Sequence, residues 1–217
     1  MIVSHQHKFI FLKTRKTAGT SLEIGLSEFC GPEDIITAIS RPDQETRSRL
    51  GFRGPQNHMS PKRFWKKSRP LFRNHNTAAQ VKAALSDDIW RDYFKFTLER
   101  NPFDKAISLY WWSTRSAAVR PDLTSFLHTV PTYKLSNWGV YAIEDCLAVD
   151  FVVRFETMSQ DLLTLEQKLG IGPIQLVRAK SSHRVDRRPY REVLSPSDRS
   201  LIERVCAREM KEFSYDW

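Results

Sequence analysis

The sequence has 217 residues, of which 41% are hydrophobic and 12% aromatic, and its formal net charge is +9. This length suits a single domain, which we expect to span residues 1–217. No stretch of about 18 residues lacks charges and no secretory leader is present, which excludes a membrane-spanning helix and leads us to expect a soluble, cytoplasmic protein. The excess of lysine and arginine favours an anionic ligand or substrate.

A short apolar strand is expected at Phe9–Leu12, and it leads into a loop that carries Arg15 and Lys16. Small and hydroxylated residues follow where a helix would begin: Thr17, Ala18, Gly19, Thr20 and Ser21. The first N–H groups of a helix have no intrahelical acceptor and bear partial positive charge, and Lys16 adds a full charge. The segment therefore predicts a phosphate-binding loop at a helix N-terminus.

This loop differs from a Walker A motif, which requires glycine, four residues, and then Gly-Lys-Ser/Thr. Here Lys16 precedes Gly19 by three positions and no glycine lies upstream. A strand-turn-helix unit that binds no ligand is the alternative interpretation of this segment taken alone.

The first helix should end near Gly31-Pro32, and residues 40–74 show little periodicity. Residues 40–74 are expected to be mostly loop, apart from a short helix beginning at Ser60-Pro61. A basic-aromatic cluster lies in this part: Lys62, Arg63, Phe64, Trp65, Lys66, Lys67 and Arg69. A surface helix is its simpler interpretation. Thr77 and Gln80 have capping-box spacing and predict the start of a further helix.

The remaining chain alternates strands with helices. Strands are expected at residues 93–99 and 151–155, and helices at residues 102–115, up to residue 169, and at 195–213. Such alternation predicts βαβ units and therefore an α/β fold with a parallel sheet. Ligands of these sheets bind at the carboxyl ends of the strands.

A second candidate site follows the strand at residues 93–99. Arg100 ends that strand and Ser108 lies eight residues on, inside the next helix. Eight helical residues span about 12 Å, but Arg100 precedes the helix and its flexible side chain can reach an anion near Ser108. The alternative interpretation is that Arg100 pairs with a carboxylate and that Ser108 is an ordinary helix serine.

Residues 15–21 and 100–110 together resemble the sulfotransferase family, which uses 3′-phosphoadenosine 5′-phosphosulfate (PAPS) as donor. Lys-Thr-Ala-Gly-Thr-Ser is similar to the family's 5′-phosphosulfate loop, and Arg-Asn-Pro-Phe-Asp-Lys followed by Ser108 is similar to its 3′-phosphate site. Arg15 stands where proline is usual, and Ala18 where glycine is usual. The resemblance implies a three-layer α/β/α, P-loop-NTPase-like sulfotransferase fold with a central parallel sheet.

The resemblance covers most of the chain and indicates a carbohydrate-type, sulfotransferase family 2-like member. Residues 151–156 resemble a later strand with its Phe-Glu turn, 180–192 the loop that closes over the nucleotide, and 212–217 the terminus of carbohydrate-type members. Lys180 and Arg184 are therefore candidate donor contacts, with a basic surface loop as the alternative. Golgi-resident members carry a membrane anchor, so the chain resembles either a bacterial cytosolic member or a catalytic fragment.

The resemblance also implies roles for the motif residues. Lys16 would hold the 5′-phosphate and stabilise the bridging oxygen as it leaves, while Arg100 and Ser108 would hold the 3′-phosphate. Further donor contacts are expected from the loop: Arg15, Thr17, Ala18, Gly19, Thr20 and Ser21. In-line sulfuryl transfer needs positioning and charge neutralisation, and no metal is expected, since the three cysteines show no metal-ligand spacing.

A hydroxyl acceptor needs a base, for which His75 is the candidate. Carbohydrate sulfotransferases of similar pattern place a histidine in the segment before the Arg-x-Pro strand, and a histidine suits general-base work near neutral pH. Other candidates are His58, His183, Glu23 and Glu156.

Two other functions stay open at this point. A P-loop kinase or NTPase would need a strand-end Asp for magnesium, whereas the strand here ends in Glu99-Arg100. A nucleic-acid-binding module would suit the charge and Trp65, but no binding motif is present and no nucleic-acid partner is expected. The expected partner is a sugar-containing acceptor, which would lie against residues 40–74 and 111–145; no oligomeric state is predicted.

Overall fold

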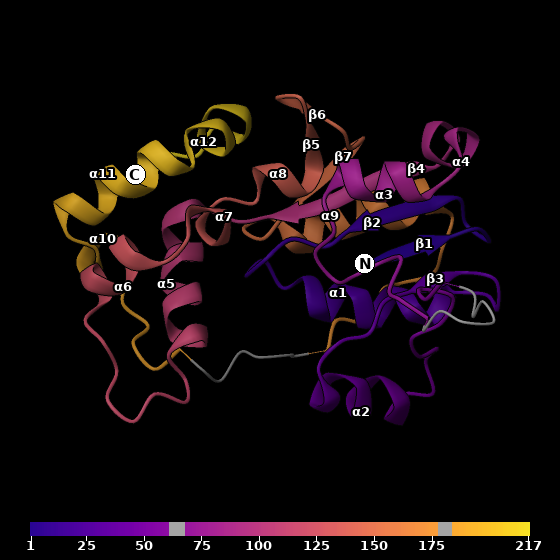
Figure 1. Cartoon of the computed structure of the whole chain (residues 1–217), viewed down its shortest axis with the longest axis horizontal. Helices are drawn as coiled ribbons and strands as arrows, with labels where there is room; N and C mark the ends of the chain where they lie inside the picture. Colours follow the sequence, from indigo (N-terminus) through magenta and orange to yellow (C-terminus); the bar gives the residue numbers. More distant parts are fainter. Residues whose placement is uncertain (61–67, 178–183) are drawn as a thin grey trace.

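A five-stranded sheet forms the centre of the computed structural model, which describes residues 1–60, 68–177 and 184–217 (Figure 1). The strand order is β3-β1-β2-β4-β7. Its strands are β1 (Ile2–Ser4), β2 (Phe9–Leu12), β3 (Ile35–Ile36), β4 (Phe94–Glu99) and β7 (Phe151–Arg154). A two-stranded sheet lies beside it, made of β5 (Ala142–Ile143) and β6 (Cys146–Leu147).

The central sheet is mixed. Strands β2, β4 and β7 run parallel to one another, while β1 is antiparallel to both β2 and β3. The predicted parallel sheet is therefore confirmed for β2, β4 and β7 and wrong for β1 and β3. The reason is the connection between β1 and β2, because residues 5–8 are enough for a hairpin and too few for a parallel crossover.

The helices connect and cover these strands. They are, in chain order, α1 (Gly19–Leu26), the 3-10 helix η1 (Ser27–Phe29), α2 (Arg41–Arg49), α3 (Ala78–Ala84), α4 (Asp87–Asp92), α5 (Pro102–Ser113), α6 (Leu123–Thr129), α7 (Thr132–Leu135), α8 (Trp138–Tyr141), α9 (Met158–Leu169), α10 (Tyr190–Val193), α11 (Pro196–Val205) and α12 (Ala207–Phe213).

Side chains of β2 alternate between two apolar clusters, as expected for a strand buried on both faces. Phe9 and Phe11 pack in a cluster with side chains of α1 and α9. Ile10 and Leu12 pack in another, with side chains of α3, α8 and α12. A third cluster joins α5, α6, α7, α10 and α11, which gather at one end of the molecule (Figure 1).

Several predicted elements are confirmed and others are corrected. The capping box of Thr77 and Gln80 opens α3, and α9 ends at Gly170, whose φ is 61°. Residues 40–74 are less loop-like than expected, because α2 begins after Ser40; its sequence lacks an apolar period, so only the proline in its first turn marks it. The final helix is broken at Cys206 into α11 and α12.

Some expectations concern residues 61–67 and 178–183, which lie outside the described residues. They include the helix expected from Ser60-Pro61, most of the basic-aromatic cluster, and the candidates Lys180 and His183. The three cysteines carry no disulfide; Cys30 and Cys206 are buried, whereas Cys146 is exposed.

Candidate active site

The loop after β2 has an uncommon backbone that turns the chain into α1. Lys16 and Ala18 both have left-handed backbone conformations, with φ of 63° and 67°. Gly19 starts the helix at a close approach, since a Cβ there would lie 3.0 Å from Lys13 Cγ and 3.3 Å from the Thr14 carbonyl oxygen. The first turn of α1 contains no acidic residue, so its N–H groups keep their attraction for an anion.

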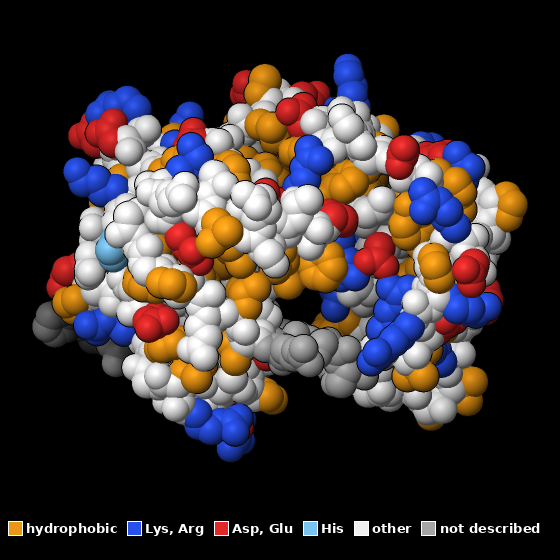
Figure 2. Space-filling view, turned by 180° about the vertical axis from the view of Figure 1, so that it is seen from behind, with side chains coloured by type: hydrophobic (Ala, Val, Ile, Leu, Met, Phe, Trp, Pro, Cys, Tyr) orange, Lys and Arg blue, Asp and Glu red, His pale blue; other side chains and the backbone are white. Residues whose placement is uncertain are grey.

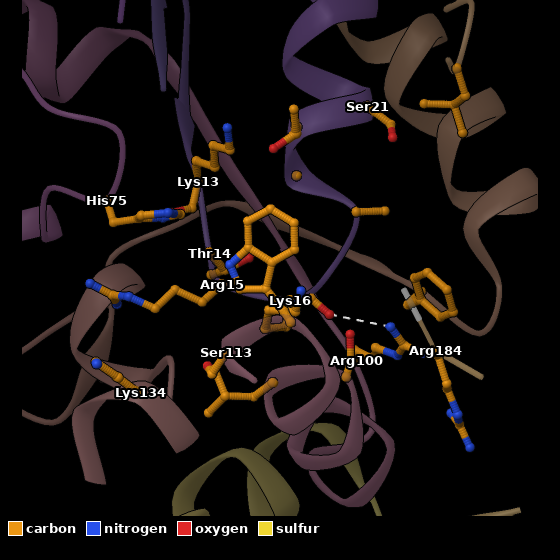
Figure 3. Close-up of a pocket in the computed structure, with 18 of the residues that line it drawn as sticks. Lys13, Thr14, Arg15, Lys16, Ser21, His75, Arg100, Ser113, Lys134 and Arg184 are labelled. Carbon is orange, nitrogen blue, oxygen red and sulfur yellow. Dashed lines mark hydrogen bonds between the residues drawn. The ribbon is translucent and has the colours of Figure 1, made fainter. Parts of the chain in front are cut away.

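A cavity of about 710 Å³ lies at the carboxyl ends of β2 and β4 and brings the two sequence motifs together. Its lining contains these predicted site residues: Arg15, Lys16, Ala18, Gly19, Thr20, Ser21, His75, Arg100, Ser108 and Arg184. Figure 3 shows His75 and Arg15 on one side of the cavity, Arg100 and Arg184 on the other, and Lys16 between them. Figure 2 shows a hollow near the middle of one face, with lysine and arginine side chains on its border.

Among the predicted contacts that the structure describes, Thr17 is the one whose side chain lies apart from the cavity. It is fully buried, and its hydroxyl lies 2.8 Å from the Thr14 hydroxyl, which donates to the Leu98 carbonyl. Thr17 can therefore offer an anion its backbone N–H and not the hydroxyl that the loop pattern suggested.

The lining is strongly cationic. Lys13 and Lys134 add to the predicted arginines and Lys16, and the described part of the lining contains no Asp or Glu. The Lys16 ammonium lies 4.8 Å from the centroid of a Trp112 ring, within cation–π range. Such a surface attracts a ligand that carries several negative charges.

Arg100 links the two motifs. Its Nη1 donates to the Lys16 carbonyl at 3.3 Å, and its guanidinium stacks 3.9 Å from the Phe155 ring centroid. Its Nε donates to Asp104 Oδ2 at 2.8 Å, while Arg184 Nη1 donates to the other oxygen of the same carboxylate at 2.5 Å. The carboxylate pairing considered for Arg100 thus exists, and it holds Arg100 beside Arg184 at the cavity.

Arg100 and Arg184 keep the Asp104 carboxylate ionised. Burial raises the pKa of Asp104, but the guanidinium groups of Arg100 and Arg184 outweigh burial and bring that pKa below its usual range. Asp104 is therefore ionised at neutral pH, and both arginines keep a defined position.

His75 has a fixed tautomer. Its Nδ1 lies 2.9 Å from the carbonyl oxygen of Lys13, and since a carbonyl only accepts, Nδ1 carries the proton. Burial lowers the pKa of His75 to about 4, although this hydrogen bond raises it. The ring is thus neutral at pH 7, its Nε2 carries a lone pair, and among the described residues no hydrogen bond engages that atom.

The other candidate bases lie elsewhere. Glu23 is buried in ion pairs with Lys13 and Arg47, and Glu156 accepts hydrogen bonds from the Asn101 N–H and the Tyr215 hydroxyl. His58 is absent from the described cavity lining. Of the candidates within the described residues, only His75 faces the cavity.

Sequence reasoning missed several lining residues. Lys13 and Leu176 stand in no motif, and only the fold brings them to the cavity. Phe155 belongs to the Phe-Glu turn seen in the sequence, which predicted no site role for it. Trp112 and Lys134 fall in the segment suggested for an acceptor, whose aromatic and basic composition was the available signal.

In residues 1–60, 68–177 and 184–217, no three His, Cys, Asp or Glu side chains are grouped as a metal site would require. In the same ranges, every helix is too short or too polar to span a bilayer.

A mixed α/β fold with a cationic cavity at the strand ends is typical of proteins that bind anionic ligands. A family model described as the sulfotransferase family matches residues 1–117, more than half of the chain and both motifs, and the chain belongs to this family. Sulfuryl transfer is therefore its general activity, and the kinase and nucleic-acid interpretations are not favoured. A search of curated proteins found no match to the chain.

Proposed function

We propose that the protein transfers a sulfuryl group from PAPS to a hydroxyl or amine of an acceptor. The carrying observation is the contact between the two motifs: the Lys16 loop and the Arg100 turn share one cavity, and Arg100 donates to the Lys16 carbonyl. Two anion-binding turns in one cavity suit a nucleotide that carries phosphate groups at both its 5′ and 3′ positions. We also propose that the fold is the three-layer, P-loop-like arrangement of this family.

The described lining fits such a donor. The N-terminus of α1, with Thr20 and Ser21, suits the 5′-phosphosulfate, and Lys16 would neutralise the charge that develops on the leaving phosphate. Arg100, Ser108 and Arg184 would hold the 3′-phosphate, which distinguishes PAPS from ATP. PAPS supplies the sulfuryl group itself, and protein side chains position it.

His75 would act as the general base. Its Nδ1–H is held by the Lys13 carbonyl, so Nε2 is the atom that would take a proton from the acceptor hydroxyl. A neutral imidazole with a lowered pKa is available over a wide range of pH. A carboxylate in the same place would repel an anionic donor, whereas a neutral ring does not.

The acceptor side of the cavity combines aromatic and cationic groups. Trp112, Ser113 and Lys134 line it, and Arg15 lies 5.7 Å from the centroid of the Tyr133 ring. Aromatic rings suit the apolar faces of sugar rings, and the cations suit polar or charged substituents. A carbohydrate or glycoconjugate is therefore the acceptor we propose, with reaction in the cytoplasm and no nucleic-acid partner.

Calorimetry tests the donor. Adenosine 3′,5′-bisphosphate should bind far more tightly than ATP or an oligonucleotide, and Arg100→Ala should weaken that binding by about 10–100-fold, the value of a charge-assisted phosphate contact. Arg91→Ala is the matched control, since Arg91 pairs with Asp88 and Asp92 on an exposed surface. Equal affinity for bisphosphate and ATP would overturn the proposed donor.

Turnover tests the base and the acceptor. Labelled PAPS with a panel of sugar acceptors should give a sulfated product, and His75→Ala should lower turnover by about 10²–10⁴-fold while it keeps bisphosphate affinity. Near-normal turnover in His75→Ala would exclude His75 as the base and leave donor binding untouched.

A further inference from the structure

A buried asparagine from a distant part of the sequence holds the Lys16 loop. Asn137 lies between α7 and α8 with no exposed surface. Its Oδ1 accepts the Arg15 N–H at 3.0 Å, and its Nδ2 donates to the Arg15 carbonyl at 3.0 Å. One side-chain amide thus takes both backbone polar groups of the residue that precedes Lys16.

The loop needs such a restraint. The φ angles of Lys16 and Ala18 lie in the left-handed region, which non-glycine residues disfavour. Backbone in this state persists when surrounding contacts determine it. The pair of hydrogen bonds from Asn137 fixes Arg15, three residues beyond the end of β2, and so fixes the direction of the N–H groups that follow.

The same amide reaches the second motif. Nδ2 of Asn137 lies 3.3 Å from Oε1 of Glu99, the last residue of β4, and that oxygen also accepts the Arg100 N–H at 2.9 Å. Lys105 Nζ donates to the same oxygen at 2.9 Å and balances its charge. Asn137 and Glu99 therefore connect the backbone of the Lys16 loop, proposed to bind the 5′-phosphosulfate (the 5′ loop), to the backbone of the Arg100 turn, proposed to bind the 3′-phosphate (the 3′ turn).

Asn137 is itself supported by the last helix. Glu209 of α12 accepts the Asn137 N–H at 2.9 Å, the Trp138 N–H at 3.1 Å and the Ser136 hydroxyl at 2.6 Å. Glu209 is fully buried, so this contact is protected from water. The residue that joins the two anion-binding turns is thus held by parts of the chain beyond residues 1–117.

We infer that Asn137 is a positioning residue that sets the spacing between the 5′ loop and the 3′ turn, and thereby favours ligands that carry anionic groups on both ends. The inference rests on the proposed function. Two anion sites at a fixed spacing bind a matching doubly charged ligand more tightly than two sites that move independently, because the second contact is then intramolecular. A ligand with one phosphate gains nothing from the fixed spacing.

The test compares three ligands by calorimetry: adenosine 3′,5′-bisphosphate, adenosine 5′-monophosphate and adenosine 3′-monophosphate. In Asn137→Ala we expect bisphosphate affinity to fall by about 10-fold or more, and the affinity for each monophosphate to change by less than about 2-fold. Asn137→Ser keeps one hydrogen-bonding group. Its ratio of bisphosphate affinity to monophosphate affinity should lie between the ratios of Asn137→Ala and the unchanged protein. The serine variant also serves if the alanine variant does not fold.

Asp34→Ala is the control for loss of a buried polar hub. Asp34 accepts hydrogen bonds from Ser4, His5 and Gly31 and is absent from the cavity lining, so its loss should lower stability and leave the affinity ratio unchanged. An equal fall for all three ligands in the Asn137 variants, or no fall, overturns the inference. If the unchanged protein does not prefer the bisphosphate, the proposed donor fails instead.

Discussion

Ala18 is one of two loop residues, with Lys16, that bear backbone strain. Its φ is 67° and ψ 15°, a conformation that costs an L-residue about 1–2 kcal/mol and costs glycine little. This explains why glycine suits the position in related loops. We predict that Ala18→Gly raises the free energy of unfolding by about 0.5–1 kcal/mol, measured by urea denaturation.

Ala83 provides the matched control for that substitution. It is an exposed residue of helix α3, where the same change should lower stability by about 0.5–1 kcal/mol. Opposite signs for the two variants support strain at Ala18, and equal losses would contradict it.

The pKa of His75 determines a pH profile. Because burial lowers that pKa to about 4, the neutral ring persists well below neutrality. We expect kcat/KM to be flat from pH 8 to about pH 5 and to fall only as His75 gains its proton near pH 4. The pKa seen in kcat should be higher, since a bound anionic donor favours the imidazolium.

An ordinary histidine, with a pKa of about 6.5, would instead lose rate between pH 7 and 6. Steady-state rates with saturating acceptor distinguish the two profiles. An inflection near pH 6.5 in kcat/KM that disappears in His75→Ala would show that the ring is more solvated than its burial indicates.

At the scale of elements, Gly25 allows α1 to pack against the segment that follows α9. A Cβ at this position would lie 2.7 Å from Ile174 Cγ2 and 2.8 Å from the Gln175 carbonyl oxygen. A backbone carbonyl cannot move aside cheaply, so Gly25→Ala should lower the free energy of unfolding by about 1–3 kcal/mol despite the better helix propensity of alanine.

Gly139→Ala is the corresponding control. Gly139 lies in helix α8, and nothing lies within 4 Å of a Cβ placed there. Thermal or urea unfolding should show this variant to be unchanged or slightly more stable. A similar loss in both glycine variants would show that the close contacts of a Cβ at position 25 are not the cause, since alanine by itself lowers the entropy of the unfolded chain and favours the fold.

The elements that carry local signals were predictable from the sequence. β2 with its loop, β4 with the Arg100 turn and the capped helix α3 all follow from apolar runs and capping residues, and the structure contains them. β1 and β3 were not predictable, since strands of three and two residues show no periodicity. Their antiparallel pairing depends on the sheet as a whole.

The candidate site likewise contains some residues that the sequence predicts and others that it does not. Lys16, Arg100 and Ser108 stand in recognisable patterns, whereas Asn137 is a single polar residue with no pattern around it. Its partner Arg15 lies 122 positions away in sequence. Likewise, the inward direction of the Thr17 hydroxyl depends on Thr14 and Leu98, which a loop pattern cannot reveal.

The molecule combines a part that matches the family model with a C-terminal part that completes the cavity. Residues 1–117, which match the family model, contain the Lys16 loop and the Arg100 turn. The chain beyond them contributes Lys134, Phe155 and Arg184 to the cavity lining and Asn137 to the loop. If the proposed donor binds in this cavity, its recognition and orientation depend on segments that lie far apart in the sequence.

A buried carboxylate joins distant segments of this unit. Glu23 of α1 has no exposed surface; its Oε2 lies 2.6 Å from Lys13 Nζ and its Oε1 3.4 Å from Arg47 Nη2 of α2. Burial raises the pKa of Glu23, but Lys13 and the other cations outweigh burial and lower it to about 2. Since the folded pKa lies below the ordinary value of 4.5, this carboxylate stabilises the fold above about pH 4.5, and the stabilisation is lost as pH falls toward 2.

We therefore predict that Glu23→Gln lowers the free energy of unfolding by about 3–5 kcal/mol at pH 7, because Lys13 and Arg47 lose their buried partner. The difference from the unchanged protein should shrink as the pH falls from 4.5 toward 2, where Glu23 itself becomes neutral. Urea unfolding at pH 7, 4 and 2.5 measures this. Glu203→Gln breaks an exposed pair with Arg199 and should change stability by less than about 0.5 kcal/mol at every pH. A pH-independent effect of Glu23→Gln would mean that side-chain shape, and not charge, carries its contribution.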